Sequence, residues 1–300
     1  AEFIIYVNML TWPVASLGWI SSIVQQAEAS QKRINEFLIE KSEIKNVENG
    51  IKKVKGKIEF KNIFFKYTDS NIQALNGISF LIKPKSSLGI IGVTGSGKTT
   101  ALKLITRSYN ISSGEILLDD HSLNKIDLIH LRENIGVVPQ DSFLFSDTII
   151  NNIRFGNEKA SKKEIEKVCE IAGIHKEILK FKDQYNTMLG ERGVNLSGGQ
   201  KQRVCIARAL IKKPKILIMD DCLSALDTET EEKIIKSLNE YIKDTTTIIS
   251  SHRISSIQNL DKIIVLNDGK IIQKGSHEEL INENGYYKQL YFKQLTEKED

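Results

Sequence analysis

The feature that most constrains this chain is the stretch Gly92–Thr99, which reads GVTGSGKT. It matches the pattern G-x-x-x-x-G-K-[ST], a glycine-rich turn that follows a buried strand and opens a helix. The apolar run LGIIG enters the stretch, and the helical pattern KTTALKLITRSY leaves it. A backbone curled in this way turns successive N–H groups toward one point, and the helix start adds a partial positive charge. The stretch therefore predicts a P-loop that cradles phosphate groups.

Each residue of this loop has an expected part in binding a nucleotide. Lys98 brings a mobile positive charge to the β- and γ-phosphates, and the Thr99 hydroxyl is expected to bind Mg²⁺. The groups around them are also expected to contact the nucleotide: Thr94, Gly95, Ser96, Gly97 and Thr100. The alternative is a glycine-rich surface turn with an exposed lysine, and the flanking strand and helix argue against it.

Two aspartates follow a second buried strand. The apolar run ILIM ends at Asp220, and Asp221 comes next. Open α/β sheets bind their ligands at the carboxyl ends of the strands. Asp220 is therefore predicted to hold Mg²⁺, and Asp221 to face the water that attacks the nucleotide. The alternative is a solvated acidic turn after a strand.

A second glycine-rich motif lies between the P-loop and these aspartates. Leu196–Gln200 reads LSGGQ and precedes a helical pattern. A serine and two glycines before a helix form an anion-binding helix start. With its motifs in this order, the chain closely resembles the ATP-binding-cassette (ABC) proteins over essentially its whole length. The resemblance implies that ATP and Mg²⁺ bound by one subunit meet the signature residues of an opposing subunit: Ser197, Gly198, Gly199 and Gln200.

The resemblance also assigns residues outside these motifs. Tyr67 resembles the aromatic residue that stacks on adenine, and Ser224–Asp227 resembles the D-loop at the dimer interface. Gln140 resembles the residue that links Mg²⁺ to the transport domain, and His252 the one that contacts the γ-phosphate. The catalytic set is then Asp221, His252 and Gln140, and the metal set is Thr99, Gln140 and Asp220. The alternatives are a core aromatic for Tyr67, a surface loop side chain for Gln140 and a structural histidine for His252.

The first part of the chain differs in composition from the rest. No charged residue occurs from Phe3 to Ala27, a stretch of about the ~20 residues that a bilayer-spanning helix needs. We expect a transmembrane helix and its cytosolic extension over 1–38, a linker over 39–56 and a nucleotide-binding domain over 57–295. The alternative is a buried helix of a soluble core. By resemblance, this is the last helix of an exporter-type half-transporter whose earlier membrane helices precede it.

The predicted fold class is α/β: a P-loop NTPase core of ABC type with a helical subdomain and an antiparallel β-subdomain, preceded by the transmembrane helix. Short apolar runs such as LGIIGV and KILIMD are typical of buried parallel strands. The segment between Gln140 and Leu210 is richer in helical patterns, which places the helical subdomain there. The segment KIIVLNDGKIIQKG predicts a hairpin of two apolar strands joined by Asn-Asp-Gly.

Asp221 departs from the family pattern, in which most hydrolysing members carry glutamate at this position. Aspartate is one methylene shorter, and a catalytic group misplaced by about 1 Å can lose on the order of a hundredfold in rate. ATP binding should persist, whereas hydrolysis at this site should be slow. In the family, such a substitution is typical of one partner in a heterodimeric exporter. A second, different half-transporter is therefore the favoured partner, and a homodimer is the alternative.

The net charge and the motifs together limit the classes of function that this chain can have. Lys and Arg number 42 against 38 Asp and Glu, for a net charge of +4, which argues against nucleic acid as a partner. The favoured function is an ATP-driven exporter subunit in the cell membrane, with its nucleotide-binding domain in the cytoplasm. The alternatives are a soluble ABC-type ATPase and a regulatory subunit that mainly binds nucleotide. The transported substrate is not specified by this part of the chain.

Overall fold

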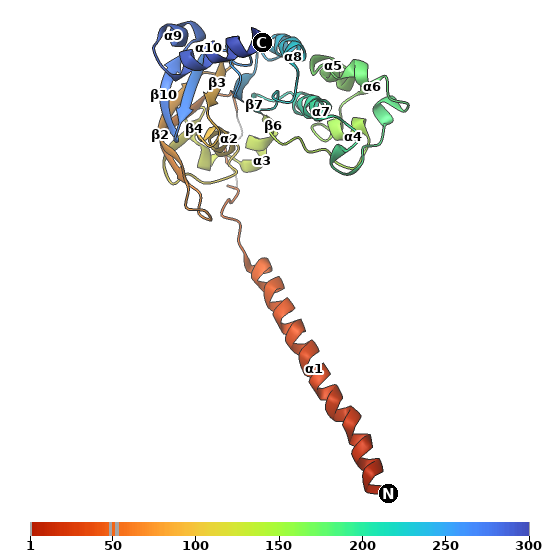
Figure 1. Ribbon diagram of the computed structural model, residues 1–300. Coiled ribbons are helices and arrows are strands. Elements are labelled where there is room, and N and C mark those ends of the chain that lie inside the picture. Colours follow the sequence, from red (N-terminus) through yellow and green to blue (C-terminus); the bar gives the residue numbers. More distant parts are fainter. Residues whose placement is uncertain (1, 48–49, 52–53, 300) are drawn as a thin grey trace. The chain divides into compact units, whose positions relative to one another are not determined.

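The computed structural model describes residues 2–47, 50–51 and 54–299 (Figure 1). The chain forms two compact units, Ala1–Glu43 and Ile44–Asp300. The first unit is built on helix α1 (Glu2–Ile39), which contains Pro13. By its length and composition, α1 is able to cross a membrane. A proline is tolerated in such helices because neighbouring polar groups satisfy the freed backbone.

The second unit contains a six-stranded sheet with the strand order β10-β9-β3-β8-β7-β6. The pairs from β9 through β6 are parallel, and β10 is antiparallel to β9. The strands are β3 (Ser87–Gly92), β6 (Ile135–Val138), β7 (Ile216–Asp220), β8 (Thr246–Ser251), β9 (Lys262–Asn267) and β10 (Lys270–Gly275). The predicted P-loop strand is thus an inner strand, between β9 and β8.

Both faces of this sheet are covered, which explains why its strands are continuous apolar runs. On β7, Ile216 and Ile218 belong to one hydrophobic core. The alternate residues Leu217 and Met219 belong to a second core on the other face. Because side chains alternate along a strand, a run that is apolar at every position is suited to a sheet between two cores.

An antiparallel sheet bounds the first of these cores. It has the order β2-β1-β4-β5 and comprises β1 (Ile58–Lys66), β2 (Gln73–Ile82), β4 (Ser113–Leu118) and β5 (His121–Ser122). Helix α2 (Lys98–Ile105) contributes Ala101, Leu104 and other residues to the same core. The ring of Phe60 on β1 stacks on that of Phe80 on β2, with centroids 4.3 Å apart. The helix that follows the P-loop is therefore packed into the core shared by both sheets.

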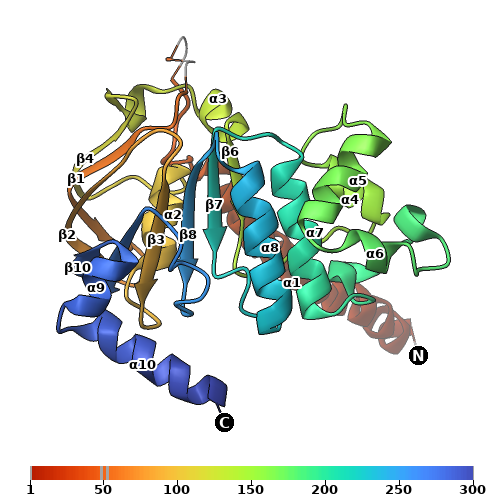
Figure 2. The same cartoon turned by 90° about the horizontal axis from the view of Figure 1, so that it is seen from above.

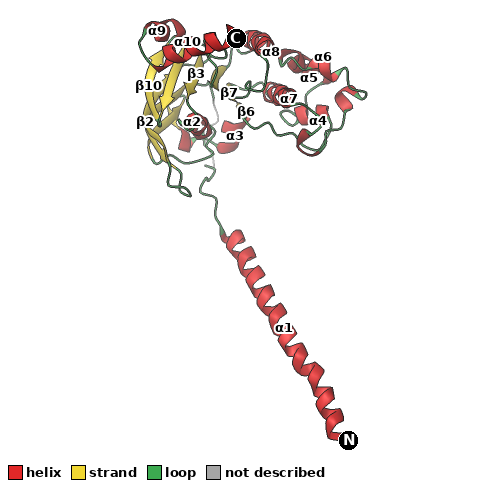
Figure 3. Cartoon of the chain, viewed as in Figure 1, coloured by secondary structure: helices red, strands yellow, loops and turns green. Residues whose placement is uncertain are grey.

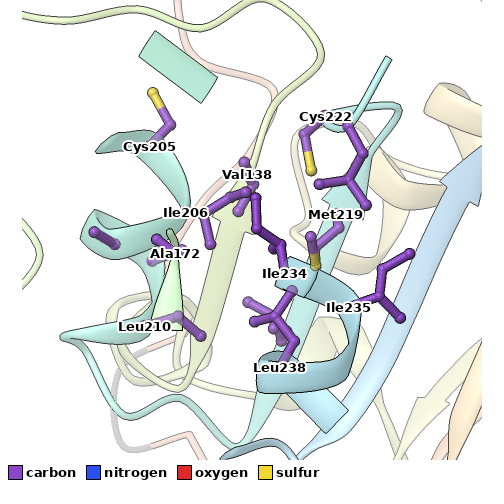
Figure 4. Packing of buried hydrophobic residues seen from close by; sticks show 14 of the residues in the cluster. Val138, Ala172, Cys205, Ile206, Leu210, Met219, Cys222, Ile234, Ile235 and Leu238 are labelled. Atoms are coloured by element: carbon purple, nitrogen blue, oxygen red, sulfur yellow. The ribbon is translucent and has the colours of Figure 1, made fainter. Parts of the chain in front are cut away.

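The second core joins the six-stranded sheet to the predicted helical region. In Figure 3 the strands of this unit gather on one side and most short helices on the other. The helices between β5 and β8 are α3 (Leu128–Glu133), α4 (Ile149–Arg154), α5 (Lys162–Ile171), α6 (His175–Ile178), α7 (Gly198–Leu210) and α8 (Thr228–Tyr241), with 3-10 turns at Leu123–Lys125, Gln184–Asn186 and Glu191–Gly193. Of these, α3 and the turn Leu123–Lys125 contribute Leu131 and Leu123 to the first core instead. Figure 2 shows α8 and α7 next to β7. In Figure 4, Ile234 and Leu238 of α8, Ile206 of α7 and Met219 of β7 gather in this core.

The C-terminal part forms the predicted hairpin and two further helices. Between β9 and β10, Asp268 and Gly269 have φ angles of 45° and 71°. Two positive φ angles at the turn are the mark of a type I′ hairpin, so the prediction is confirmed. Helices α9 (His277–Asn282) and α10 (Tyr286–Glu299) follow.

One local detail differs from the sequence patterns. Helix α2 ends at Ile105 rather than extending to Tyr109, because Arg107 has a left-handed φ of 52°. The second compact unit begins at Ile44, within the segment predicted as a linker. The Asp119 carboxylate accepts hydrogen bonds from the backbone N–H of Lys55 (2.5 Å) and Lys57 (2.9 Å), which fastens this segment to the antiparallel sheet. The domain bounds 1–38, 39–56 and 57–295 remain predictions.

Candidate nucleotide-binding site

The P-loop joins the end of β3 to the start of α2. Gly97 has a φ of 102°, and a Cβ there would lie 2.6 Å from the Ala74 carbonyl oxygen, so only glycine fits. Helix α2 starts without a side-chain cap, and its first internal hydrogen bond runs from Ala101 N to Gly97 O. The preceding N–H groups of the helix therefore have no partner within it. This arrangement can receive the oxygens of a phosphate group.

The Lys98 side chain folds back onto this loop. Its Nζ donates to the carbonyl oxygens of Gly92 (2.7 Å) and Val93 (3.0 Å). Burial lowers the pKa of the Lys98 ammonium from its ordinary 10.5, while the Asp221 and Asp220 carboxylates oppose that shift. An anion beside Nζ would relieve the cost of burying this charge, as expected of a phosphate-binding lysine.

Asp220 ends β7 and is held by the neighbouring strand. It is paired in register with Ser250 of β8. The Ser250 hydroxyl donates to Asp220 Oδ1 at 2.5 Å, and both residues are buried. The other carboxylate oxygen is left for a further ligand. Ser250 was not predicted as a site residue, because its partner lies on a strand distant in the sequence.

Asp221 occupies the first position after the strand. Its φ of 43° is left-handed, a conformation that aspartate adopts more readily than most residues. Its N–H donates to the Ser250 carbonyl oxygen at 3.0 Å. Burial raises the pKa of the Asp221 carboxyl above its usual 3.8, against opposing effects of His252 and Lys98. A carboxylate of raised pKa beside a phosphate site is suited to polarise a water molecule.

Tyr67 lies where the antiparallel sheet meets α2. Its hydroxyl is hydrogen bonded to Thr100 Oγ1 at 3.0 Å, and its ring meets Phe65 and Tyr109 edge-on. The side chain is half-buried, so part of it remains open to a ligand. Stacking on adenine remains a prediction for Tyr67.

One cleft brings most of the predicted residues together. Gln140, which follows β6, and His252, which follows β8, line it together with the P-loop and both aspartates. The lining residues are Tyr67, Ile72, Ala74, Thr94, Gly95, Gly97, Lys98, Thr99, Thr100, Gln140, Asp220, Asp221 and His252. Ser96 is absent from this lining, and its hydroxyl is buried without a hydrogen-bond partner in the described chain. Contact of Ser96 with a phosphate remains a prediction.

The signature residues do not line this cleft. Ser197 caps α7: its hydroxyl accepts from Gln200 N (3.3 Å), and Gln200 Oε1 accepts from Ser197 N (2.9 Å). Gln200 Nε2 also donates to Glu177 Oε2 at 2.8 Å, and Arg203 Nη1 donates to Glu177 Oε1 at 2.5 Å. Burial acts to raise the pKa of Glu177, but the hydrogen bonds from Arg203 and Gln200 hold it below its usual 4.5. Glu177, which was not predicted, therefore fixes the helix start that carries the signature.

The donor set of the cleft fits a nucleotide with Mg²⁺. Thr99, Gln140 and Asp220, whose side chains carry oxygen atoms, all line it. In the described part of the chain, no group of three or more His, Cys, Asp or Glu side chains is arranged to hold a metal ion by itself. Mg²⁺ usually binds through one or two carboxylates together with substrate phosphates and water, so these residues suit an ion brought with the nucleotide.

The comparison with protein families agrees with this geometry. Residues 75–224, half of the chain, match the family described as ABC transporter. This chain belongs to the ABC transporter family. The predicted family and fold class are therefore confirmed, and the second unit is an ABC transporter ATPase domain.

Curated ABC proteins resemble nearly the whole chain. The Multidrug resistance-like ATP-binding protein MdlA of Buchnera aphidicola is 44% identical over 299 residues, which are 99% of this chain and 52% of that protein. The MdlA of Escherichia coli is 40% identical, over 99% of this chain and 50% of that protein. ATP-binding cassette sub-family B member 6 of Mus musculus is 41% identical, over 95% of this chain and 34% of that protein. The chain thus spans about half the length of the bacterial relatives.

A solved ABC transporter structure has the same fold. It is a bacterial Atm1-family ABC exporter with ATP bound, and it matches with a TM-score of 0.85 and 36% sequence identity. The match covers 96% of this chain and 51% of that one. His252 lies outside the family match at residues 75–224, although it lines the same cleft.

Proposed function

We propose that this chain is the ATP-binding and ATP-hydrolysing part of an ABC exporter subunit. The observation that carries the proposal is the single cleft that joins the P-loop to Asp220, Asp221, Gln140 and His252. The signature residues Ser197–Gln200 lie outside that cleft, which favours a second subunit that supplies its own signature. The relatives named as exporters or multidrug-resistance-like proteins support a transport role. The apolar helix α1 supports a membrane location with the cassette in the cytoplasm.

Each side chain of the cleft has a role in ATP binding or hydrolysis that follows from its position. Lys98 moves from its carbonyl contacts to the β- and γ-phosphates, and the α2 N–H groups hold phosphate oxygens. Thr99, Gln140 and Asp220 would hold Mg²⁺, which would supply positive charge to the phosphates when bound. Asp221 polarises the attacking water, and His252 contacts the γ-phosphate. The Ser250 hydroxyl keeps the Asp220 carboxylate in one orientation.

Asp221 makes this site slow and favours a heterodimer. In the left-handed conformation of this residue the short side chain is tolerated, but its carboxylate is retracted by one methylene relative to glutamate. In the proposed assembly, a different half-transporter brings the faster site, and Ser197–Gln200 of this chain complete it. The membrane helices determine which substrate is transported. A second candidate function is a subunit that binds nucleotide with negligible hydrolysis. It is supported by the same residue, Asp221.

The test is steady-state ATPase activity of the full-length transporter, purified with the subunit that accompanies it. Asp221→Glu is expected to raise turnover, because the longer side chain reaches the water. Lys98→Ala should abolish ATP binding at this site, whereas the matched variant Lys103→Ala, at an exposed position of the same helix, should not. Absence of ATP binding in the wild type would refute the proposal. Binding without hydrolysis in both the wild type and Asp221→Glu would favour the second candidate.

A further inference from the structure

The turn that carries His252 follows the end of β8 and has no regular structure of its own. His252 is half-exposed and lines the nucleotide cleft. The direction of a side chain depends on the orientation of the peptide groups on either side of its Cα. In a turn these groups have no ladder of hydrogen bonds to fix them, so other partners must do so.

One side chain of the C-terminal helix holds this turn. Gln294 of α10 donates from Nε2 to the His252 carbonyl oxygen at 2.7 Å. Its Oε1 accepts a hydrogen bond from Ile254 N at 2.9 Å. A single planar amide therefore binds both backbone groups that flank Arg253. The first bond holds the peptide group after His252 and the second holds the peptide group after Arg253, both from outside the nucleotide cleft.

The opposite side of the turn is joined to the D-loop. Arg253 Nη1 donates to the Leu226 carbonyl oxygen (3.0 Å) and to Glu231 Oε2 (2.8 Å). The Glu231 side chain is fully buried and also accepts a hydrogen bond from Ser255. The Arg253 N–H also donates to Ser251 Oγ at 2.9 Å. Arg253 thus joins the turn to the D-loop and α8, whereas Gln294 joins it to α10, and no described residue of these three elements lines the cleft.

We propose that Gln294 is a positioning residue for His252, by which the C-terminal helix α10 sets the catalytic geometry of the cleft. The inference rests on the proposed function in so far as His252 contacts the γ-phosphate there. Without the amide, His252 keeps its side chain but loses the fixed backbone that aims it. ATP binding, which depends on the P-loop, is expected to persist, and the chemical step is expected to slow.

The test replaces the amide with a side chain of the same length that forms no such hydrogen bonds. Gln294→Met is compared with Gln289→Met, which makes the same exchange at an exposed position of the same helix. In the full-length transporter whose partner site has been inactivated, the remaining kcat reports this chain's own site. Gln294→Met should lower that kcat about tenfold, since small misplacements of catalytic groups cost that much or more. KM for ATP should stay within about twofold, because P-loop binding is unchanged. Hydrogen exchange at the Ile254 amide should accelerate in Gln294→Met and remain unchanged in Gln289→Met.

The possible outcomes separate this proposal from the proposed function. An unchanged kcat, an equal loss in both variants, or unaltered exchange at Ile254 overturns the positioning role. If the wild type hydrolyses no ATP, the proposed function fails, and the exchange measurement still decides whether Gln294 holds the turn. If Gln294→Met fails to fold, Gln294→Asn replaces it, because the shorter amide cannot span both backbone groups. It should show the same kcat loss and faster exchange.

Discussion

Removal of the Ser250 hydroxyl should destabilise the cassette and weaken its response to Mg²⁺. In the structure this hydroxyl donates to Asp220 Oδ1 at 2.5 Å and accepts from Asp221 N at 3.1 Å. Both contacts are buried, so water cannot replace them readily. Ser250→Ala deletes one oxygen atom and leaves the surrounding packing nearly unchanged. The variant therefore isolates the hydrogen bonds from the volume of the side chain.

The expected loss of unfolding free energy in Ser250→Ala follows from the charge of the acceptor, the Asp220 carboxylate. A hydrogen bond to a charged group contributes about 1.5–3 kcal/mol. The bond from Asp221 N contributes less, because the same N–H also donates to the Ser250 carbonyl oxygen at 3.0 Å, which the substitution keeps. We expect a loss of about 2 kcal/mol, which lowers Tm by roughly 4–8 °C for a domain of this size class.

The assay compares thermal unfolding and Mg²⁺-dependent ATP binding of the wild type and Ser250→Ala. Thr247→Val is the control, because it removes a neutral hydroxyl bond (to the Thr245 carbonyl oxygen, 3.3 Å) from the same strand. The control should cost about 1 kcal/mol or less. Ser250→Ala should also need more Mg²⁺ for half-maximal ATP binding. Equal Tm shifts in both variants, with an unchanged Mg²⁺ requirement, would refute the role assigned to Ser250.

Three further predictions follow from the site. Gly97→Ala should abolish binding of a fluorescent ATP analogue, because its Cβ would meet the Ala74 carbonyl oxygen at 2.6 Å; Gly95→Ala, with open space around it, should bind more strongly than Gly97→Ala. Glu177→Ala should lower the stability by about 1–3 kcal/mol, since Arg203 and Gln200 lose their shared acceptor, and a Tm measurement checks this. The raised pKa of Asp221 places the acid limb of hydrolysis at this chain's own site above pH 3.8, whereas Asp221→Asn, which lacks the carboxylate that polarises the water, should leave that site inactive at every pH. Because the folded state binds this proton more tightly than the unfolded state, the unfolding free energy should fall as pH rises through that window, which unfolding curves at several pH values will test.

The part of the site that depends on local patterns could be predicted from the sequence. The P-loop, the strand that ends at Asp220 and the Asp-Gly hairpin each depend on residues close together in the chain. The contacts that hold these residues could not be predicted in the same way. Ser250 reaches Asp220 through the register of two parallel strands, and Gln294 reaches His252 through the packing of α10. Such contacts depend on tertiary arrangement, which periodicity does not encode.

Hydrophobic periodicity also did not predict where a helix ends. The pattern after the P-loop continues to Tyr109, but the chain leaves the helix near Arg107 in a left-handed conformation. The segment before β1 reads as a linker because it carries few apolar residues. In the structure its Lys55 and Lys57 N–H groups donate to the Asp119 carboxylate, a type of contact that residue composition does not reveal.

The position of the P-loop strand has a consequence for how the protein is made. On the ribosome, β3 emerges early, yet both of its neighbours in the sheet, β8 and β9, come more than a hundred residues later. The Gly269 amide, which donates to the Ser96 carbonyl oxygen at 3.2 Å, belongs to the same late segment. A nascent chain that ends before β8 therefore holds the full P-loop motif but neither of the strands that pair with β3. Closing contacts over so long a stretch is slow, so competence to bind ATP should arise near the end of synthesis.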